Sequence, residues 1–143
     1  MHPFLSYAGV VAVHVVANVV WIGSILSVAL LVAGAPFMAD PADAGRLGRR
    51  IYLRLAVPAF LVSFACGAAR LQASPQAYLH MPWLHAKLAA AVLVIALHHA
   101  IGGRARRVAD GKTEAAGGAG FLGFLLFVFA AAATTLGVLK SFP

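Results

Sequence analysis

Hydrophobic residues in this chain fall into four long runs that are separated by short segments rich in glycine, proline and charge. The runs cover residues 4–32, 51–71, 83–101 and 121–139. About 20 apolar residues in a helix cross the hydrocarbon core of a bilayer, which is roughly 30 Å thick. Each run reaches or approaches that length. The pattern therefore predicts an all-α integral membrane protein, a four-helix bundle that forms one transmembrane domain over residues 1–143.

Composition agrees with lipid as the main solvent of this chain. Hydrophobic residues make up 62% of the sequence and charged residues 10%, whereas a soluble domain carries about 25% charged residues. The 11 Lys and Arg against 4 Asp and Glu give a formal charge of +7. Most of these cations flank apolar runs, so we expect anionic lipid headgroups rather than nucleic acid as their partners.

The distribution of cations between the connecting segments predicts the orientation. Seven cations lie in the first and third connections, on one side of the membrane: Arg46, Arg49, Arg50, Arg104, Arg106, Arg107 and Lys112. The opposite side has Arg70 and Lys140, with Lys87 just inside the third run. The positive-inside rule then makes the basic loops cytoplasmic and puts both termini outside the cytoplasm. We expect a multi-pass protein of the cell inner (cytoplasmic) membrane.

Polar residues form a stripe on the first predicted helix. Asn18 follows His14 by four residues and Trp21 follows Asn18 by three, spacings that place all three on one helix face. Such a face meets the bundle interior, a cofactor or water. The alternative is a neutral His14 that hydrogen-bonds to a neighbouring helix, with Asn18 strengthening the same contact. We favour a functional site because His14 has no obvious acidic partner.

The third run carries ionisable residues near both of its ends. Counting about 1.5 Å per residue, His14, His85 and Lys87 fall in the outer half of the bilayer. His98 and His99 lie about 20 Å further in. One metal site can therefore combine His14 with His85 or Lys87, but not with His99. We expect the inner pair to meet headgroups, a second cofactor or the arginines.

The side chains available inside the spans narrow the metal chemistry. Cys66 is the only cysteine and no carboxylate lies in any run, which excludes a thiolate-rich or acid-rich site. Met1, Met38 and Met81 do not form a Cu(I)-type thioether cluster. Neutral imidazoles in an apolar bundle suit haem iron better, although imidazole also binds copper.

A family pattern is spread in order over most of the chain. Its parts are His14 with Trp21 and Gly23, Arg50-Ile51-Tyr52 with Pro58, Trp83-Leu84-His85-Ala86-Lys87-Leu88, and His99 with Gly103-Arg104. These stretches resemble the motifs of the HemJ-type, oxygen-independent protoporphyrinogen IX oxidases and of the related CopD-like copper-resistance membrane proteins. The stretch that begins at Trp83 is the most specific of the four.

The resemblance implies a haem b protein that passes electrons from a tetrapyrrole substrate, a porphyrinogen, to a membrane electron acceptor. It implies that His14 is a haem ligand, that Lys87 is essential, and that Trp21, Arg50 and Trp83 line the site. With the polar stripe, the candidate cofactor-binding residues are His14, Asn18, Trp21, Trp83, His85, Lys87 and His99. The candidate catalytic residues are Lys87 and Arg50, and the candidate metal ligands are His14 and His85.

One stretch departs from the oxidases. They carry a second histidine, preceded by an arginine, near the cytoplasmic end of the first helix, and residues 28–36 contain neither here. The form Trp21-Ile22-Gly23 is closer to the CopD-like relatives. Two alternatives therefore stay open beside the haem protein: a CopD-like copper transport or binding protein, and a structural subunit of a membrane complex. A homo-oligomer is compatible with each.

Overall fold

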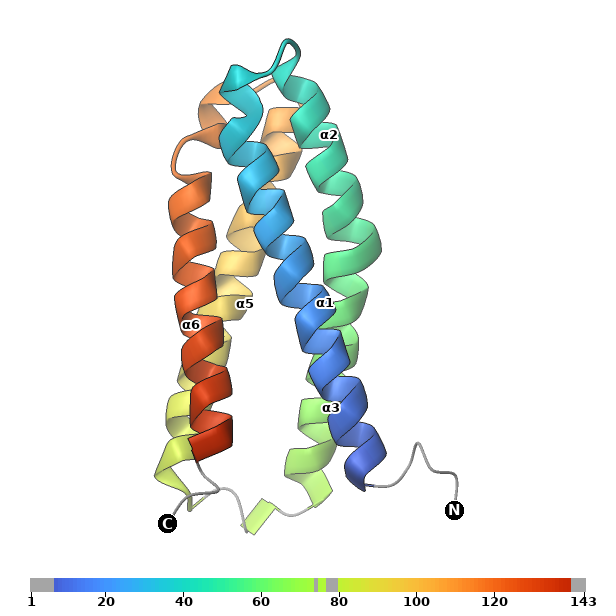
Figure 1. Cartoon of the computed structure of the whole chain (residues 1–143), viewed down its shortest axis with the longest axis vertical. Helices are drawn as coiled ribbons and strands as arrows, with labels where there is room; N and C mark the ends of the chain where they lie inside the picture. Colours follow the sequence, from blue (N-terminus) through green and yellow to red (C-terminus); the bar gives the residue numbers. More distant parts are fainter. Residues whose placement is uncertain (1–6, 74, 77–79, 140–143) are drawn as a thin grey trace.

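The computed structural model describes residues 7–73, 75–76 and 80–139, and within these residues all regular elements are helical. Four segments are long and apolar enough to cross a membrane, as the sequence predicts. They form an up-and-down bundle in which the start of α1 and the end of α6 lie at the same end (Figure 1). The expected helix start at residue 4 and the cation Lys140 lie outside the described residues.

The first two helices are α1 (Tyr7–Gly34) and α2 (Pro41–Ile51), joined by the short helix η2 (Ala35–Phe37). We expected the second helix to begin at Ile51, but it begins ten residues earlier. Pro41 occupies the first turn, where its missing N–H is not needed, and Asp40 caps the helix by accepting the N–H of Ala42 at 2.9 Å. The turn-favouring residues of this segment therefore start a helix instead of forming a loop.

A five-residue π-helix, η3 (Tyr52–Ala56), connects α2 directly to α3 (Val57–Ala73). The N–H of Val57 bonds to the carbonyl of Tyr52, five residues back. Pro58 follows, and because proline has no N–H it cannot serve the carbonyl of Arg54 in an α-helical register. The wider π-turn relieves that conflict. Pro58 thus coincides with a local change of helical register.

The second half of the chain consists of α5 (Pro82–Ala109), the short helix η4 (Thr113–Ala116) and α6 (Ala119–Leu139). We expected α5 to end at residue 101, before a glycine-rich loop, but it continues for two more turns. Arg104 then stabilises the segment between α5 and α6 by donating hydrogen bonds to the carbonyls of Ala115 and Gly117. Burial of the last turns of α5 explains the extension, because Ile101, Ala105 and Val108 are completely buried.

The tightest packing lies at the end of the bundle that carries α2 and η4. A Cβ on Gly45 would lie 2.2 Å from the backbone nitrogen of Ala109, so α2 and α5 touch through their backbones. The completely buried large side chains include Ile25, Val28, Val32, Ile101, Val108 and Leu126. On the surface of the bundle, by contrast, many large apolar side chains are exposed, as expected for a surface that faces lipid.

Candidate functional site

The first polar contact between helices joins His14 of α1 to α3. The imidazole is half-buried, and its Nδ1 lies 2.8 Å from the backbone oxygen of Ser63. Because a carbonyl oxygen only accepts hydrogen bonds, Nδ1 carries the ring proton and donates it. The neutral ring then keeps the lone pair of Nε2 for another partner. Histidines that bind a metal through Nε2 show this same arrangement, with Nδ1–H held by a carbonyl.

Asn18 and the hydroxyl of Ser63 complete this contact. Oγ of Ser63 donates to Oδ1 of Asn18 at 2.9 Å and lies 3.4 Å from Nδ1 of His14. His14 and Asn18 therefore both point from one face of α1 to α3, which is the helix-to-helix hydrogen bonding that the sequence left open as the alternative to a functional site. Sequence reasoning missed Ser63, which is 3% exposed. Its only signal was an isolated hydroxyl within an apolar run.

Lys87 enters the same end of the bundle from α5. The side chain is half-buried, and a Cβ built on Gly137 of α6 would lie 3.2 Å from Nζ, so the amine extends toward α6. The charges of Lys87 and Arg70 both act on His14. Arg70 itself donates to the hydroxyl of Tyr7 at 2.7 Å. Two cationic side chains therefore lie at the same end of the bundle as His14.

The other candidates divide between the two ends of the bundle. Trp83 is half-buried and His85 is exposed, both near the start of α5, at the same end as His14. Arg50 is exposed in the last turn of α2, at the opposite end (Figure 1). Within the described ranges, no group of three or more His, Cys, Asp or Glu side chains gathers as a metal-ligand cluster.

A second polar contact between helices joins Trp21 of α1 to His98 of α5. The indole N–H of Trp21 donates to Nδ1 of His98 at 3.0 Å, and both side chains are buried. The rings of Tyr52 and Phe60 lie 4.8 Å and 5.5 Å from that of His98. His98 thus meets neither headgroups nor the arginines, contrary to our expectation, because it is 0% exposed within an aromatic cluster.

The bond to Trp21 fixes the opposite tautomer in His98 from that in His14. An indole N–H only donates, so Nδ1 of His98 is the unprotonated nitrogen and Nε2 carries the proton. Nε2 is buried and finds no hydrogen-bond partner among the described residues. A proton-bearing Nε2 has no lone pair for a metal. In this arrangement, the geometry suits His14 to metal binding and His98 to helix packing.

His99 and Tyr52 form the outer edge of this aromatic cluster. Nδ1 of His99 lies 3.0 Å from the hydroxyl of Tyr52, and His99 is exposed on the bundle surface. Tyr52 is seated against Gly102, where a Cβ would come within 2.3 Å of the phenol ring. His99 therefore belongs to the contact between η3 and α5. It lies apart from His14, whose partner Ser63 is in α3, more than two helical turns beyond Tyr52.

Together, these contacts place a half-buried imidazole with an unprotonated Nε2 at the end of the bundle that also holds Arg70 and Lys87, and a second, structural imidazole nearer the α2 end. The chain matches no family model, and comparisons with curated proteins and with solved structures found no match.

Proposed function

We propose that this protein binds haem b in the membrane through His14 and works as a redox protein similar to the oxygen-independent protoporphyrinogen IX oxidases. The observation that carries the proposal is the hydrogen bond from Nδ1 of His14 to the carbonyl of Ser63. This bond holds the ring in the tautomer that a metal ligand needs and fixes its direction. Haem iron is already held by the four porphyrin nitrogens and takes only one or two ligands from the protein.

The cationic side chains near His14 supply the second part of the argument. Tetrapyrroles of this class carry carboxylates, which Arg70 and Lys87 would balance at the same end of the bundle. Trp83 and His85, near the start of α5, border that end. When bound, haem b supplies one-electron transfer between the substrate and a membrane acceptor, while the chain's own residues bind, orient and exclude water.

The distribution of charge gives the orientation that goes with this proposal. The end of the bundle that carries α2 and η4 holds most of the cations, so it faces the cytoplasm by the positive-inside rule. His14 then lies in the outer half of the bilayer, and the start of α1 and the end of α6 lie on the outer side. A cysteine-labelling test of exposed loop positions in intact cells would reveal the opposite orientation directly.

A second candidate function is a structural subunit of a membrane complex, and the same hydrogen bonds favour it. His14 with Ser63 and Trp21 with His98 are contacts of the kind that hold transmembrane helices together. In that role His14 needs no ligand. The third candidate, copper binding, uses the same free Nε2 lone pair on a different metal.

Absorption spectroscopy of the purified protein separates these candidates. We expect a Soret band and sharp alpha and beta bands on reduction, and loss or displacement of these bands in His14→Ala. The matched control is His80→Ala, which removes an exposed histidine outside the bundle interior. A colourless protein that binds copper would favour the copper protein, and one that binds neither would favour the structural subunit.

Growth of a host whose only protoporphyrinogen oxidase is this protein tests the enzymatic part. We expect Lys87→Ala to stop haem synthesis while the variant still inserts into the membrane, because the family resemblance makes Lys87 essential and its amine extends into the bundle toward Gly137 of α6. Normal growth of the host with Lys87→Ala would contradict the assignment of Lys87 as an essential residue.

A further inference from the structure

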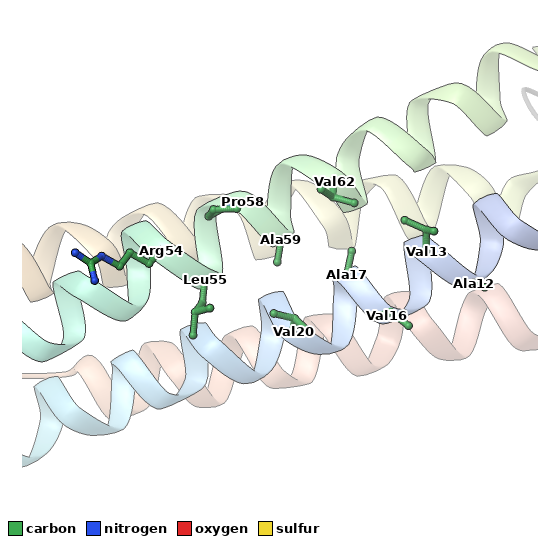
Figure 2. Close-up of a pocket in the computed structure, with 10 residues that line it drawn as sticks. All are labelled: Ala12, Val13, Val16, Ala17, Val20, Arg54, Leu55, Pro58, Ala59 and Val62. Carbon is green, nitrogen blue, oxygen red and sulfur yellow. The ribbon is translucent and has the colours of Figure 1, made fainter. Parts of the chain in front are cut away.

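An apolar groove of about 490 Å³ runs along the outside of the bundle, between α1 and the helix formed by η3 and α3. Figure 2 shows one charged side chain, Arg54, at one end of it, and alanines, valines, a leucine and a proline along the rest. The groove is therefore an open, apolar depression on the surface with a single cation at its end.

The depth of the groove follows from the sequence on both of its walls. Ala12 and Ala17 line the α1 wall and Ala59 the α3 wall, so short side chains leave space between the helices. On the α3 side, Pro58 and Leu55 line the groove, and the π-turn adds a residue to the helical turn at Leu55. The space is thus built by the fold and does not depend on one flexible side chain.

Arg54 is the polar group of this groove. It is exposed, and among the described residues its guanidinium has neither a hydrogen bond nor an ion pair. Figure 2 shows its side chain extending toward the α2 end, where most of the cations of the protein lie. An unneutralised guanidinium next to hydrocarbon favours an anionic partner.

We infer that the groove binds one acyl chain of an anionic phospholipid from the leaflet at the α2 end, with the lipid phosphate on Arg54. The lining from Arg54 to Val62 spans about 12 Å along the helix, which accommodates a large part of an acyl chain. A guanidinium pairs with phosphate oxygens through two parallel hydrogen bonds. The lipid is thus recognised in two ways: its phosphate by the charge of Arg54, and its acyl chain by apolar contact with the alanines and valines of the groove.

Native mass spectrometry of the full chain in detergent tests this inference. The protein is offered an equimolar mixture of phosphatidylglycerol and phosphatidylcholine with identical acyl chains. We expect one bound lipid, mainly phosphatidylglycerol, and a loss of this preference by about fivefold in Arg54→Gln. The matched control Arg49→Gln removes an exposed cation that does not line the groove and is expected to keep the preference.

A second pair of variants tests the apolar part. Ala12→Phe fills the groove and is expected to reduce binding of both lipids, whereas Ala100→Phe, on an exposed face of α5, is expected to leave binding unchanged. Equal binding of the two lipids by the wild type, or full preference in Arg54→Gln, would overturn the inference. Displacement of the lipid by glycerol phosphate, which has no acyl chain, would overturn it as well.

Discussion

The indole N–H of Trp21 donates to Nδ1 of His98 across the interface between α1 and α5, at 3.0 Å and with His98 completely buried. This bond joins two residues that are 77 positions apart in the chain. It also determines that Nε2 of His98 carries the proton, so that neither nitrogen of this ring offers a lone pair to a metal.

Trp21→Phe keeps an aromatic ring at this interface and removes the donor. We expect a loss of stability of about 0.5–2 kcal/mol, because Nδ1 of His98 then stays buried without a partner. Denaturant unfolding in detergent, followed by circular dichroism, measures the change. In a double-mutant cycle with His98→Leu, the second substitution should cost less in the Trp21→Phe background than in the wild type. Strict additivity of the two substitutions would show that the bond contributes nothing.

Gly45→Ala tests the close approach of α2 and α5. A Cβ at this position would lie 2.2 Å from the backbone nitrogen of Ala109, so the helices must move apart. We expect destabilisation by about 1–3 kcal/mol in the same unfolding assay. Gly48→Ala is the matched control in the same helix, since its Cβ would meet the nearest atom at an ordinary 3.6 Å. Equal stability of the two variants would contradict this packing.

Gly102→Ala tests the seat of the Tyr52 ring in the same way. The added Cβ would lie 2.3 Å from the ring and displace the phenol from His99. We expect lower stability, with partial recovery when Tyr52→Leu is added, because the smaller side chain leaves room. Gly103→Ala, where a Cβ meets nothing within 4 Å, provides the control for helix propensity. If Gly102→Ala were as stable as Gly103→Ala, the Tyr52 ring would not pack against Gly102.

The stability of the first turn of α2 should depend on pH. Hydrogen bonds from the N–H of Ala42 and from the Arg46 guanidinium hold the pKa of the Asp40 carboxyl below its ordinary value of 3.8. A carboxyl whose pKa is lowered by folding stabilises the fold above its unfolded pKa, and the effect disappears as pH falls through the folded value. We expect faster amide exchange in the first turn of α2 at about pH 3 than at neutral pH, after correction for the intrinsic rate.

Asp40→Asn supplies the control for this pH effect. The amide side chain can still accept the N–H of Ala42 but does not titrate in this range. We therefore expect the exchange of this first turn in Asp40→Asn to show no corresponding dependence on pH. An equal change in the wild type and the variant would assign the effect to other groups.

Much of the candidate site could be found from spacing alone, because a helix has a fixed period. His14 and Asn18 fall on one face in any α-helix, and in an apolar segment that face must turn inward. The partner of that face could not be predicted. Ser63 and His98 come from distant segments, and only packing decides which helix lies beside α1 and in which register. The tautomers of the two histidines follow from those partners.

The sequence by itself determined the four helices long enough to cross a membrane, because the bilayer thickness sets the length of an apolar run. It also determined the basic end of the bundle, because alternate connections lie on the same side and their Lys and Arg residues can be compared directly. Tertiary structure alone decided that α2 and the end of α5 are helical where glycine, proline and charge predicted loops. There, burial of Ala44, Gly45 and Ala105 between helices outweighs weak local propensity. It likewise decided that the unprotonated nitrogen of His14 has no hydrogen-bond partner among the described residues while that of His98 accepts from Trp21, since a partner from another helix determines which nitrogen carries the proton.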